Sequence, residues 1–334
     1  MIENIKEIYK RKLSNLDSKD HFCLYIDIPF CRSRCEYCIY NSLQLGNYKE
    51  EREKYAAAVI EQLSEYKELF EIKTPDSIYF GGGTPSLWTI SELNQIIDNI
   101  PGFDMIKSKK MESHPSDMTE DRIRFYAEKM KLDVVSLGVQ SFDKNSCQGQ
   151  KRIWVGEKKI KDIVQKLHQY GIYVNIDLVA LFNGDEEKDW QVFDNDMDIA
   201  CNFVMPDVIT SIPNYKTSLV YIEQIPRFRT ILKKYVGDKY FPISEKMLSM
   251  NPDAIRAYGE NDHWLATKEY WYYQETNFRY SSSSPTSSVP KNQVTLAIGG
   301  AGEHRVYGYV SDNFIVYSSF DFNKNKFEYE IVNK

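Results

Sequence analysis

The 334-residue sequence is poor in several features, and each shortage excludes a class of protein. Six cysteines are too few for a small disulfide-rich fold, and the charged N-terminal stretch lacks the apolar core of a secretory leader. No apolar run reaches the roughly 18 residues that suggest a membrane-spanning helix. The net charge of −6 differs from the basic charge of general nucleic-acid binders. We therefore expect a cytoplasmic protein with neither a membrane nor a nucleic acid as its partner.

What is present is a compact cysteine motif, formed by Cys31, Cys35 and Cys38, which we call the motif cysteines. Their spacing, Cys-x3-Cys-x2-Cys, supplies three thiolates, whereas a 4Fe–4S cluster bound only by protein takes four. One iron would therefore stay open for a substrate or cofactor, as one position does in catalytic metal sites. A structural zinc site is the alternative, but zinc prefers four protein ligands. We find no second Cys-x2-Cys pair among the remaining cysteines, which we expect to be ordinary buried thiols: Cys23, Cys147 and Cys201.

Strand and helix patterns alternate over the first two thirds of the chain. Short apolar runs predict six strands, at 23–30, 77–80, 110–114, 134–142, 173–182 and 207–213. Helical spacing of apolar residues predicts helices at 50–70, at 91–100, from 119 onward, at 157–170 and at 187–200. This alternation predicts an α/β fold with a parallel sheet, which we interpret as a partial (β/α)6 barrel. Functional residues in such barrels gather at the carboxyl ends of the strands.

The chain divides into three parts in this interpretation. Residues 1–20 form an N-terminal helix, 21–215 the partial barrel, and 216–334 a small, mixed, β-rich C-terminal region that serves the substrate or a second cofactor. Within this last part, a strand followed by a glycine turn is expected at 293–302. Alternating aromatic and polar residues predict β-hairpins at 305–332.

A run of glycines, Gly81, Gly82 and Gly83 followed by Thr84, comes directly after the second predicted strand. It lacks the spacing of a dinucleotide-binding fingerprint, but glycines let a backbone approach a ligand closely. The alternative is a tight turn only. Together with the cysteine motif, this run resembles the radical S-adenosylmethionine (SAM) enzymes. In that family the open iron binds the amino and carboxylate groups of SAM, and the glycine-rich run receives the methionine ammonium group. Reductive cleavage then gives methionine and a 5′-deoxyadenosyl radical.

Further segments narrow the resemblance to the oxygen-independent coproporphyrinogen III oxidase branch of that family. They are Ile28-Pro-Phe-Cys31, Phe80-Gly-Gly-Gly-Thr-Pro-Ser86, Ser136-Leu-Gly-Val-Gln-Ser-Phe142 and Asn175-Ile-Asp-Leu178. The branch includes the anaerobic porphyrinogen oxidase, a haem chaperone, haem-degrading enzymes, and class C methyltransferases and cyclopropanases. The similarity covers residues 24–213 well.

The resemblance implies a role for several single residues. Tyr25 would lie against the cluster and SAM as a catalytic residue. Four polar residues would surround the first SAM: Glu112, Gln140, Arg152 and Asp177. An arginine can pair with the methionine carboxylate and an aspartate can accept from ribose hydroxyls. The alternatives are a solvated Lys151–Arg152 pair and a salt bridge of Glu112 at the barrel rim.

A second SAM site is a further expectation, based on Ala297-Ile-Gly-Gly-Ala-Gly302, which resembles a glycine-rich segment near such a site in this branch. Gly299 and Gly300 would contact that SAM, and the neighbouring His304 would be catalytic. The alternative is that these glycines only shape a turn between strand and loop.

Three departures argue against porphyrinogen decarboxylation itself. Asp27 stands where the porphyrinogen oxidase has a histidine, and Tyr40 stands where it has a cysteine. The stretch Ala180-Leu-Phe-Asn183 replaces an expected Tyr-Gly-Leu-Pro. A haem chaperone or another tetrapyrrole-processing protein, an oxidoreductase in that case, remains the alternative function.

The leading expectation is an enzyme that cleaves SAM on a 4Fe–4S cluster to modify a small metabolite or natural-product intermediate. A second SAM would supply a methyl or methylene group, which would make the enzyme a transferase of the methyltransferase type. The resemblance also implies anaerobic chemistry and an electron donor such as a flavodoxin or a ferredoxin.

Overall fold

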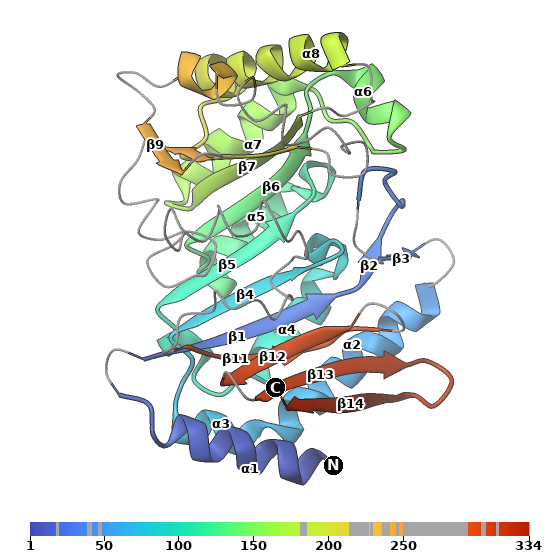
Figure 1. Cartoon of the computed structure of the whole chain (residues 1–334), viewed down its shortest axis with the longest axis vertical. Coiled ribbons are helices and arrows are strands. Elements are labelled where there is room, and N and C mark those ends of the chain that lie inside the picture. The colour runs from blue at the N-terminus through green and yellow to red at the C-terminus, as the bar shows by residue number, and fades with distance from the viewer. Residues whose placement is uncertain are drawn as a thin grey trace.

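The computed structural model describes residues 1–17, 20–38, 42–45, 49–180, 186–213, 227, 230–235, 241–244, 247–249, 293–301, 305–311 and 314–333. Its main feature is one large twisted sheet (Figure 1). In chain order the sheet contains β1 (His21–Ile28), β4 (Ser77–Gly82), β5 (Ser108–Ser113), β6 (Val134–Gln140), β7 (Tyr173–Ala180), β8 (Val208–Pro213), β9 (Phe241–Ser244), β10 (Met247–Ser249) and β11 (Gln293–Ile298).

Seven neighbouring strands of this sheet run parallel, in the order β11-β1-β4-β5-β6-β7-β8. β10 and β9 continue the sheet beyond β8 in antiparallel pairing. Six of the parallel strands are the six that the apolar runs predict, so the predicted α/β class with a partial barrel is confirmed. The predicted strand at 293–302 also exists, and it joins the barrel strands by pairing with β1, with Tyr25 opposite Ala297.

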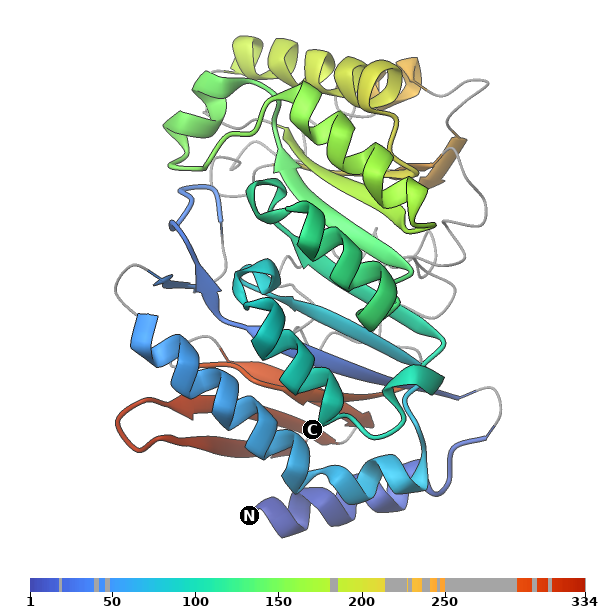
Figure 2. The ribbon, with the colours of Figure 1, turned by 180° about the vertical axis from the view of Figure 1, so that it is seen from behind.

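Helices cover one face of the sheet (Figure 2). They are α2 (Lys49–Glu65), α4 (Ile90–Asp98), α5 (Glu120–Phe125), α6 (Lys144–Gly149), α7 (Glu157–Gln169) and α8 (Glu186–Asp198), while α1 (Ile2–Leu13) and α3 (Lys67–Ile72) lie at one end. The helix expected at 50–70 is interrupted at Tyr66, and the short α6 is not predicted. Thr119 accepts a bond from the Arg122 backbone and begins α5, as expected of a helix N-cap. Among the described helices, none is both long and apolar enough to cross a bilayer.

The C-terminal strands β12 (Val306–Ser311), β13 (Phe314–Asp321) and β14 (Lys326–Asn333) form an antiparallel sheet, which confirms the predicted hairpins. They lie beside β11 and α1 (Figure 1). The Tyr9 hydroxyl of α1 donates to the backbone oxygen of Thr295 at 3.0 Å, which ties the N-terminal helix to β11. The boundaries at residues 20 and 215 stay a prediction.

Alternation along the parallel strands separates the core from the opposite face. Leu24, Ile26 and Ile28 of β1 are fully buried in the main hydrophobic core. Each such side chain contributes about 2 kcal/mol relative to exposure. Because successive strand residues point to opposite faces, Tyr25 and Asp27 lie on the other face of the sheet. This second face is also buried near β1, because Tyr25 packs in a small cluster with Tyr79, Ala297 and Val306, and it carries the polar side chains of the candidate site.

Candidate active site

The acidic residues of the candidate site come from every other strand of the parallel part of the sheet, β1, β5 and β7. Asp27 stands opposite Gly81 in the pairing of β1 with β4, and Glu112 stands opposite Ser136 in that of β5 with β6. Asp177 stands opposite Gly138 in the pairing of β6 with β7. The carboxyl ends of parallel strands meet at one edge of a sheet, where barrel enzymes place their functional groups. The strand pattern therefore brings residues far apart in sequence together.

The cysteine motif begins where β1 ends. Phe30 and Cys31 form the short strand β2 (Phe30–Cys31), which pairs with β3 (Leu43–Gln44). The Thr84 hydroxyl donates to the Cys31 sulfur at 3.3 Å. Burial raises the pKa of the Cys31 thiol, and the hydroxyls of Ser42 and Thr84 oppose that rise. The loop after β4 thus holds the first motif cysteine directly.

The motif cysteines lie around one side chain, Tyr37. Burial raises the pKa of the Tyr37 hydroxyl, Arg152 opposes that rise, and the thiolates of all three motif cysteines add to it, so all three lie near this residue. A 4Fe–4S cluster binds each thiolate to a different iron and therefore spreads its ligands. The other three cysteines are buried, as expected of ordinary thiols: Cys23, Cys147 and Cys201. The residues present thus fit a cluster with three protein ligands.

The three glycines let the end of β4 press against β1 and the cysteine loop. A β-carbon at Gly82 would lie 2.5 Å from the Asp27 Oδ1 atom, and one at Gly83 would lie 2.6 Å from the Phe30 backbone oxygen. Gly82 also has a φ of 110°, in the region that favours glycine. At Gly81 a β-carbon would lie 2.8 Å from the rings of Tyr25 and Tyr79. Close backbone approach within the protein already requires glycine here, and contact with an ammonium group stays a prediction.

Arg152 reaches back to the cysteine loop. One guanidinium nitrogen donates to the Tyr37 hydroxyl at 3.0 Å and lies 3.9 Å from the Cys35 sulfur. The other terminal nitrogen donates to the Gly138 backbone oxygen. Lys151 instead pairs with Glu36. Arg152 is therefore not one half of a solvated Lys151–Arg152 pair, which was the alternative.

Gln140 lies beside this arginine. It follows an irregularity in the β6 register between Gly138 and Gln140 and has a φ of 71°. A β-carbon at Gly138 would lie 3.0 Å from the Gln140 amide nitrogen and 3.1 Å from an Arg152 guanidinium nitrogen. The two side chains therefore lie together over Gly138, which has no side chain to keep them apart.

Glu112 is held by a tyrosine hydroxyl. Tyr79 donates to its Oε1 atom at 2.6 Å, so the bond found here comes from a phenol and not from a cation at the rim. Burial raises the pKa of Glu112 to about 8, the Tyr79 hydroxyl opposes this, and Asp177 and Asp27 add to it. A carboxyl group of this kind is protonated near neutral pH and can ionise when a cation arrives.

Asp177 is held in a network of neutral polar groups. Ser136 and Asn175 donate to its two oxygens at 3.0 and 2.9 Å, and Thr210 donates to the Asn175 amide oxygen at 2.9 Å. Burial raises the pKa of Asp177 to about 6, and the two donors and Arg152 oppose that rise. The network therefore fixes the orientation of the carboxylate.

Tyr25 completes this group from β1. Its hydroxyl donates to the Asp27 Oδ1 atom at 3.3 Å, and its ring stacks on that of Tyr79 with centroids 6.0 Å apart. Sequence reasoning missed Tyr79 and Asn175 as parts of the site. For Asn175 the sequence holds a usable signal. That residue precedes Asp177 by two residues in an otherwise apolar strand, and side chains two apart lie on the same face of a sheet.

The expected second SAM site lies partly outside the described residues, because His304 and Gly302 belong to the part of the chain that is not described. Gly299 and Gly300 are buried at the end of β11. The Gly299 backbone N–H donates to Gln62 Oε1, and its carbonyl accepts from the Ser318 hydroxyl, both at 2.9 Å. Protein groups therefore occupy both backbone positions of Gly299, and its contact with a second SAM stays a prediction.

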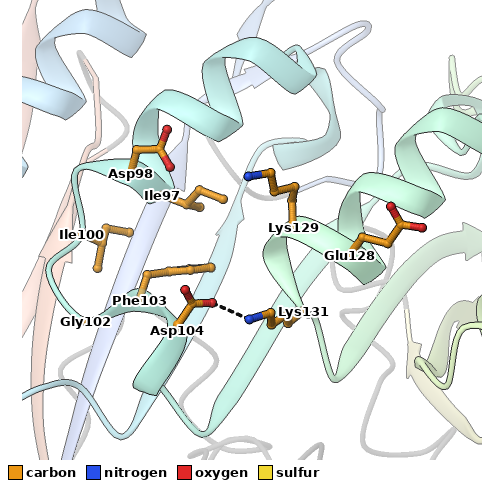
Figure 3. Close-up of a pocket in the computed structure, with 9 residues that line it drawn as sticks. All are labelled: Ile97, Asp98, Ile100, Gly102, Phe103, Asp104, Glu128, Lys129 and Lys131. Atoms are coloured by element: carbon orange, nitrogen blue, oxygen red, sulfur yellow. Dashed lines mark hydrogen bonds and ion pairs between the residues drawn. The ribbon is translucent and has the colours of Figure 1, made fainter.

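A separate pocket of about 410 Å³ lies between α4 and the π-helix Tyr126–Met130 that continues α5 (Figure 3). Asp104 and Lys131 pair across it at 2.8 Å. These residues precede β5 and β6, so the pocket lies at the amino ends of the strands, opposite the cysteine loop. None of the predicted site residues lines it.

Comparison with known proteins agrees with this site. Residues 25–196 match the radical SAM superfamily. A heme chaperone HemW from Lactococcus lactis is 29% identical over 164 residues, which are 48% of this chain and 41% of that protein. An oxygen-independent coproporphyrinogen III oxidase from Helicobacter pylori is 27% identical over 175 residues, which are 49% of this chain and 37% of that enzyme. The chain thus aligns with about two fifths of these relatives.

The fold has a solved counterpart. Coproporphyrinogen III oxidase (HemN) from Escherichia coli superimposes with a TM-score of 0.67 at 15% identity, over 94% of this chain and 70% of that enzyme. At this identity the likeness concerns the fold. The motif cysteines, the strand ends around them and these matches together lead to one conclusion: the chain belongs to the radical SAM superfamily.

Proposed function

We propose that this protein reductively cleaves SAM on a 4Fe–4S cluster and uses the resulting radical to modify a small metabolite or natural-product intermediate. The cluster and SAM are the cofactors of the family to which the chain belongs. The observation that carries the proposal is the chain of contacts from the cysteine loop to the two carboxyl groups: Arg152 lies 3.9 Å from the Cys35 sulfur and acts on Asp177, which in turn acts on Glu112. When bound, the cluster supplies the electron that breaks a carbon–sulfur bond of SAM.

The chain's own residues would bind and orient SAM. Asp177 would accept hydrogen bonds from the ribose hydroxyls, since Ser136 and Asn175 hold its oxygens in place. Glu112 would face a cationic group of SAM and lose its proton on contact. Arg152 would contact the methionine carboxylate with the part of its guanidinium group that Tyr37 and Gly138 leave available. Tyr25 would lie against both cofactors from the neighbouring strand.

Transfer of a methyl or methylene group from a second SAM is the finer part of this proposal. Its support is the similarity of the segment around Gly299 and Gly300 to a second SAM site in the branch. The test is a single anaerobic assay of the reconstituted full chain with SAM and a reductant. A two-SAM reaction gives 5′-deoxyadenosine together with S-adenosylhomocysteine and a methylated product. Deoxyadenosine alone, with no methyl group transferred to any substrate tested, argues against methyl transfer and leaves a one-SAM reaction.

A haem chaperone is the second candidate, and the identity with HemW relatives favours it. The discriminating experiment is a haem titration of the purified full chain, followed through the Soret band. A saturable red shift at one haem per chain supports the chaperone role. A Soret band that stays at the position of free haem counts against it. In either case we place the protein in the reducing cytoplasm, where thiols stay available for a cluster and where a flavodoxin or ferredoxin can supply electrons.

A further inference from the structure

An ion pair outside the predicted site links the cysteine loop to the barrel. Arg32, between the first two motif cysteines, pairs with the Asp117 Oδ1 atom. The Asp117 side chain is 2% exposed, whereas that of Arg32 is 43% exposed. The buried carboxylate is thus capped by a cation that the cysteine loop supplies. Removing such a partner leaves a buried charge uncompensated, which is costly.

Asp117 belongs to the loop that follows Glu112. The chain leaves β5 after Ser113, the residue next to Glu112, and passes through the 3-10 turn at Pro115–Asp117. The Ser116 hydroxyl donates to the Asp117 Oδ1 atom at 3.3 Å. A hydroxyl of its own turn therefore helps to orient this carboxylate, in addition to the arginine.

A third residue, Ser86, joins Arg32 and Asp117. Ser86 lies three residues after the last glycine of the run, is buried, and donates to the Asp117 Oδ2 atom at 2.6 Å. The same hydroxyl accepts from the His114 backbone N–H at 3.0 Å. Ser86 therefore joins the loop after β4 to the loop after β5. Two residues earlier, Thr84 donates to the Cys31 sulfur. The loop after β4 thus holds the cysteine loop at two points, directly at Cys31 and through Asp117 at Arg32.

We propose that Arg32, Asp117 and Ser86 form a latch that sets the position of the cysteine loop before a cluster is present. Arg32 and Asp117 are positioning residues in this proposal, because they act through the contact between them and are not among the residues that would bind the cluster or SAM. The latch also connects the cysteine loop to the segment that carries Glu112, so that the cluster ligands and a SAM-binding carboxyl group keep a fixed relation. The contacts themselves are present in the protein without a cofactor. Only the role assigned to them, positioning of cluster ligands, rests on the proposed function.

The test uses thiol reactivity in the full chain without iron. Alkylation of the motif cysteines is followed by peptide mass spectrometry in the parent protein and in Arg32→Gln. Loss of the ion pair frees the loop, so we expect alkylation to be about 5- to 30-fold faster, which corresponds to one charged contact. The buried thiols of Cys147 and Cys201 report on global unfolding and should keep their rates. The matched control is Lys151→Gln, which removes a solvent-exposed ion pair with Glu36 of the same loop. Because an exposed pair contributes little to stability, this variant should behave like the parent.

A double-mutant cycle assigns the effect to the pair. Asp117→Asn keeps an oxygen for Ser86 but removes the charge, and it should also speed alkylation. The double variant Arg32→Gln/Asp117→Asn should then be no faster than the faster single variant. Parent-like alkylation in Arg32→Gln overturns the proposal. Equal acceleration at all six cysteines also overturns it, because the ion pair would then only stabilise the fold.

The same variants separate this inference from the proposed function. After reconstitution, iron loss to a chelator should be faster in Arg32→Gln than in Lys151→Gln, by a similar factor. If even the parent chain takes up no cluster, the proposed function fails. The thiol rates, measured without iron, still decide whether the latch exists.

Discussion

Binding of SAM to the reconstituted protein at pH 7 should release a proton, and Glu112 is its source. The pKa of Glu112 is about 8, mainly because the group is buried, so about nine tenths of it is protonated at pH 7 before SAM binds. The ammonium or sulfonium charge of SAM favours the carboxylate, and an opposite charge at close range lowers a pKa by about 1 to 3 units. The release should therefore be about 0.4 to 0.9 protons per SAM.

Isothermal titration calorimetry in two buffers of different ionisation enthalpy measures this number. Glu112→Gln has no proton to release and should show about 0.1 or fewer, the remainder coming from Asp177, whose pKa is about 6. Tyr79→Phe is the matched control, because it removes the hydroxyl that holds the pKa of Glu112 down. It should release more protons than the parent at pH 8.5. Equal proton release by Glu112→Gln and the parent at pH 7 would refute the assignment of Glu112 to a cationic group of SAM.

The same raised pKa makes a prediction for the ligand-free protein. A carboxyl group whose pKa is higher in the folded state destabilises the fold as pH rises from about 4.5 through 8. Glu112→Gln should therefore match the parent at pH 5 and exceed its unfolding free energy at pH 8.5 by on the order of 3 kcal/mol. Urea unfolding at the two pH values measures the difference.

Three further substitutions test other parts of the site. Alanine at any motif cysteine should abolish the brown chromophore and SAM cleavage, because the cluster loses a ligand; full iron loading and activity in one such variant would contradict the three-thiolate site. Asp177→Asn should weaken SAM binding about tenfold without changing iron content. Below pH 6, where Asp177 gains a proton, the affinity of the parent should fall more steeply with pH than that of the variant, in which only Glu112 still titrates. Gly300→Ala should keep 5′-deoxyadenosine formation and lose S-adenosylhomocysteine, whereas a parallel loss of both products indicates a turn that only supports the fold.

Much of the fold could be predicted because its strands are buried on both faces or on alternate residues. Apolar runs such as that of β7 stand out in any sequence. The pairing of β11 with β1 could not be predicted, because it joins segments almost the whole chain apart. The short α6 and the interruption at Tyr66 also escaped, since neither leaves a repeat long enough to recognise.

The candidate site also contains residues that the sequence predicts and residues that it does not. The motif cysteines and the glycine run are recognisable because their chemistry depends on local spacing. The partners Tyr79, Ser86 and Asp117 are not, because each acts on a residue of another strand or loop. No fixed separation in sequence links such a residue to its partner. Its role is visible only once the fold brings the two strands or loops together.

The central claim is that three thiolates of this chain hold a cluster on which SAM is cleaved. Its most direct test is the amount of 5′-deoxyadenosine formed from SAM by the anaerobically reconstituted, reduced full chain, measured by mass spectrometry beside Cys35→Ala. We predict deoxyadenosine from the parent protein and none above background from the variant. Equal deoxyadenosine from both proteins, or none from a fully iron-loaded parent, would contradict the account.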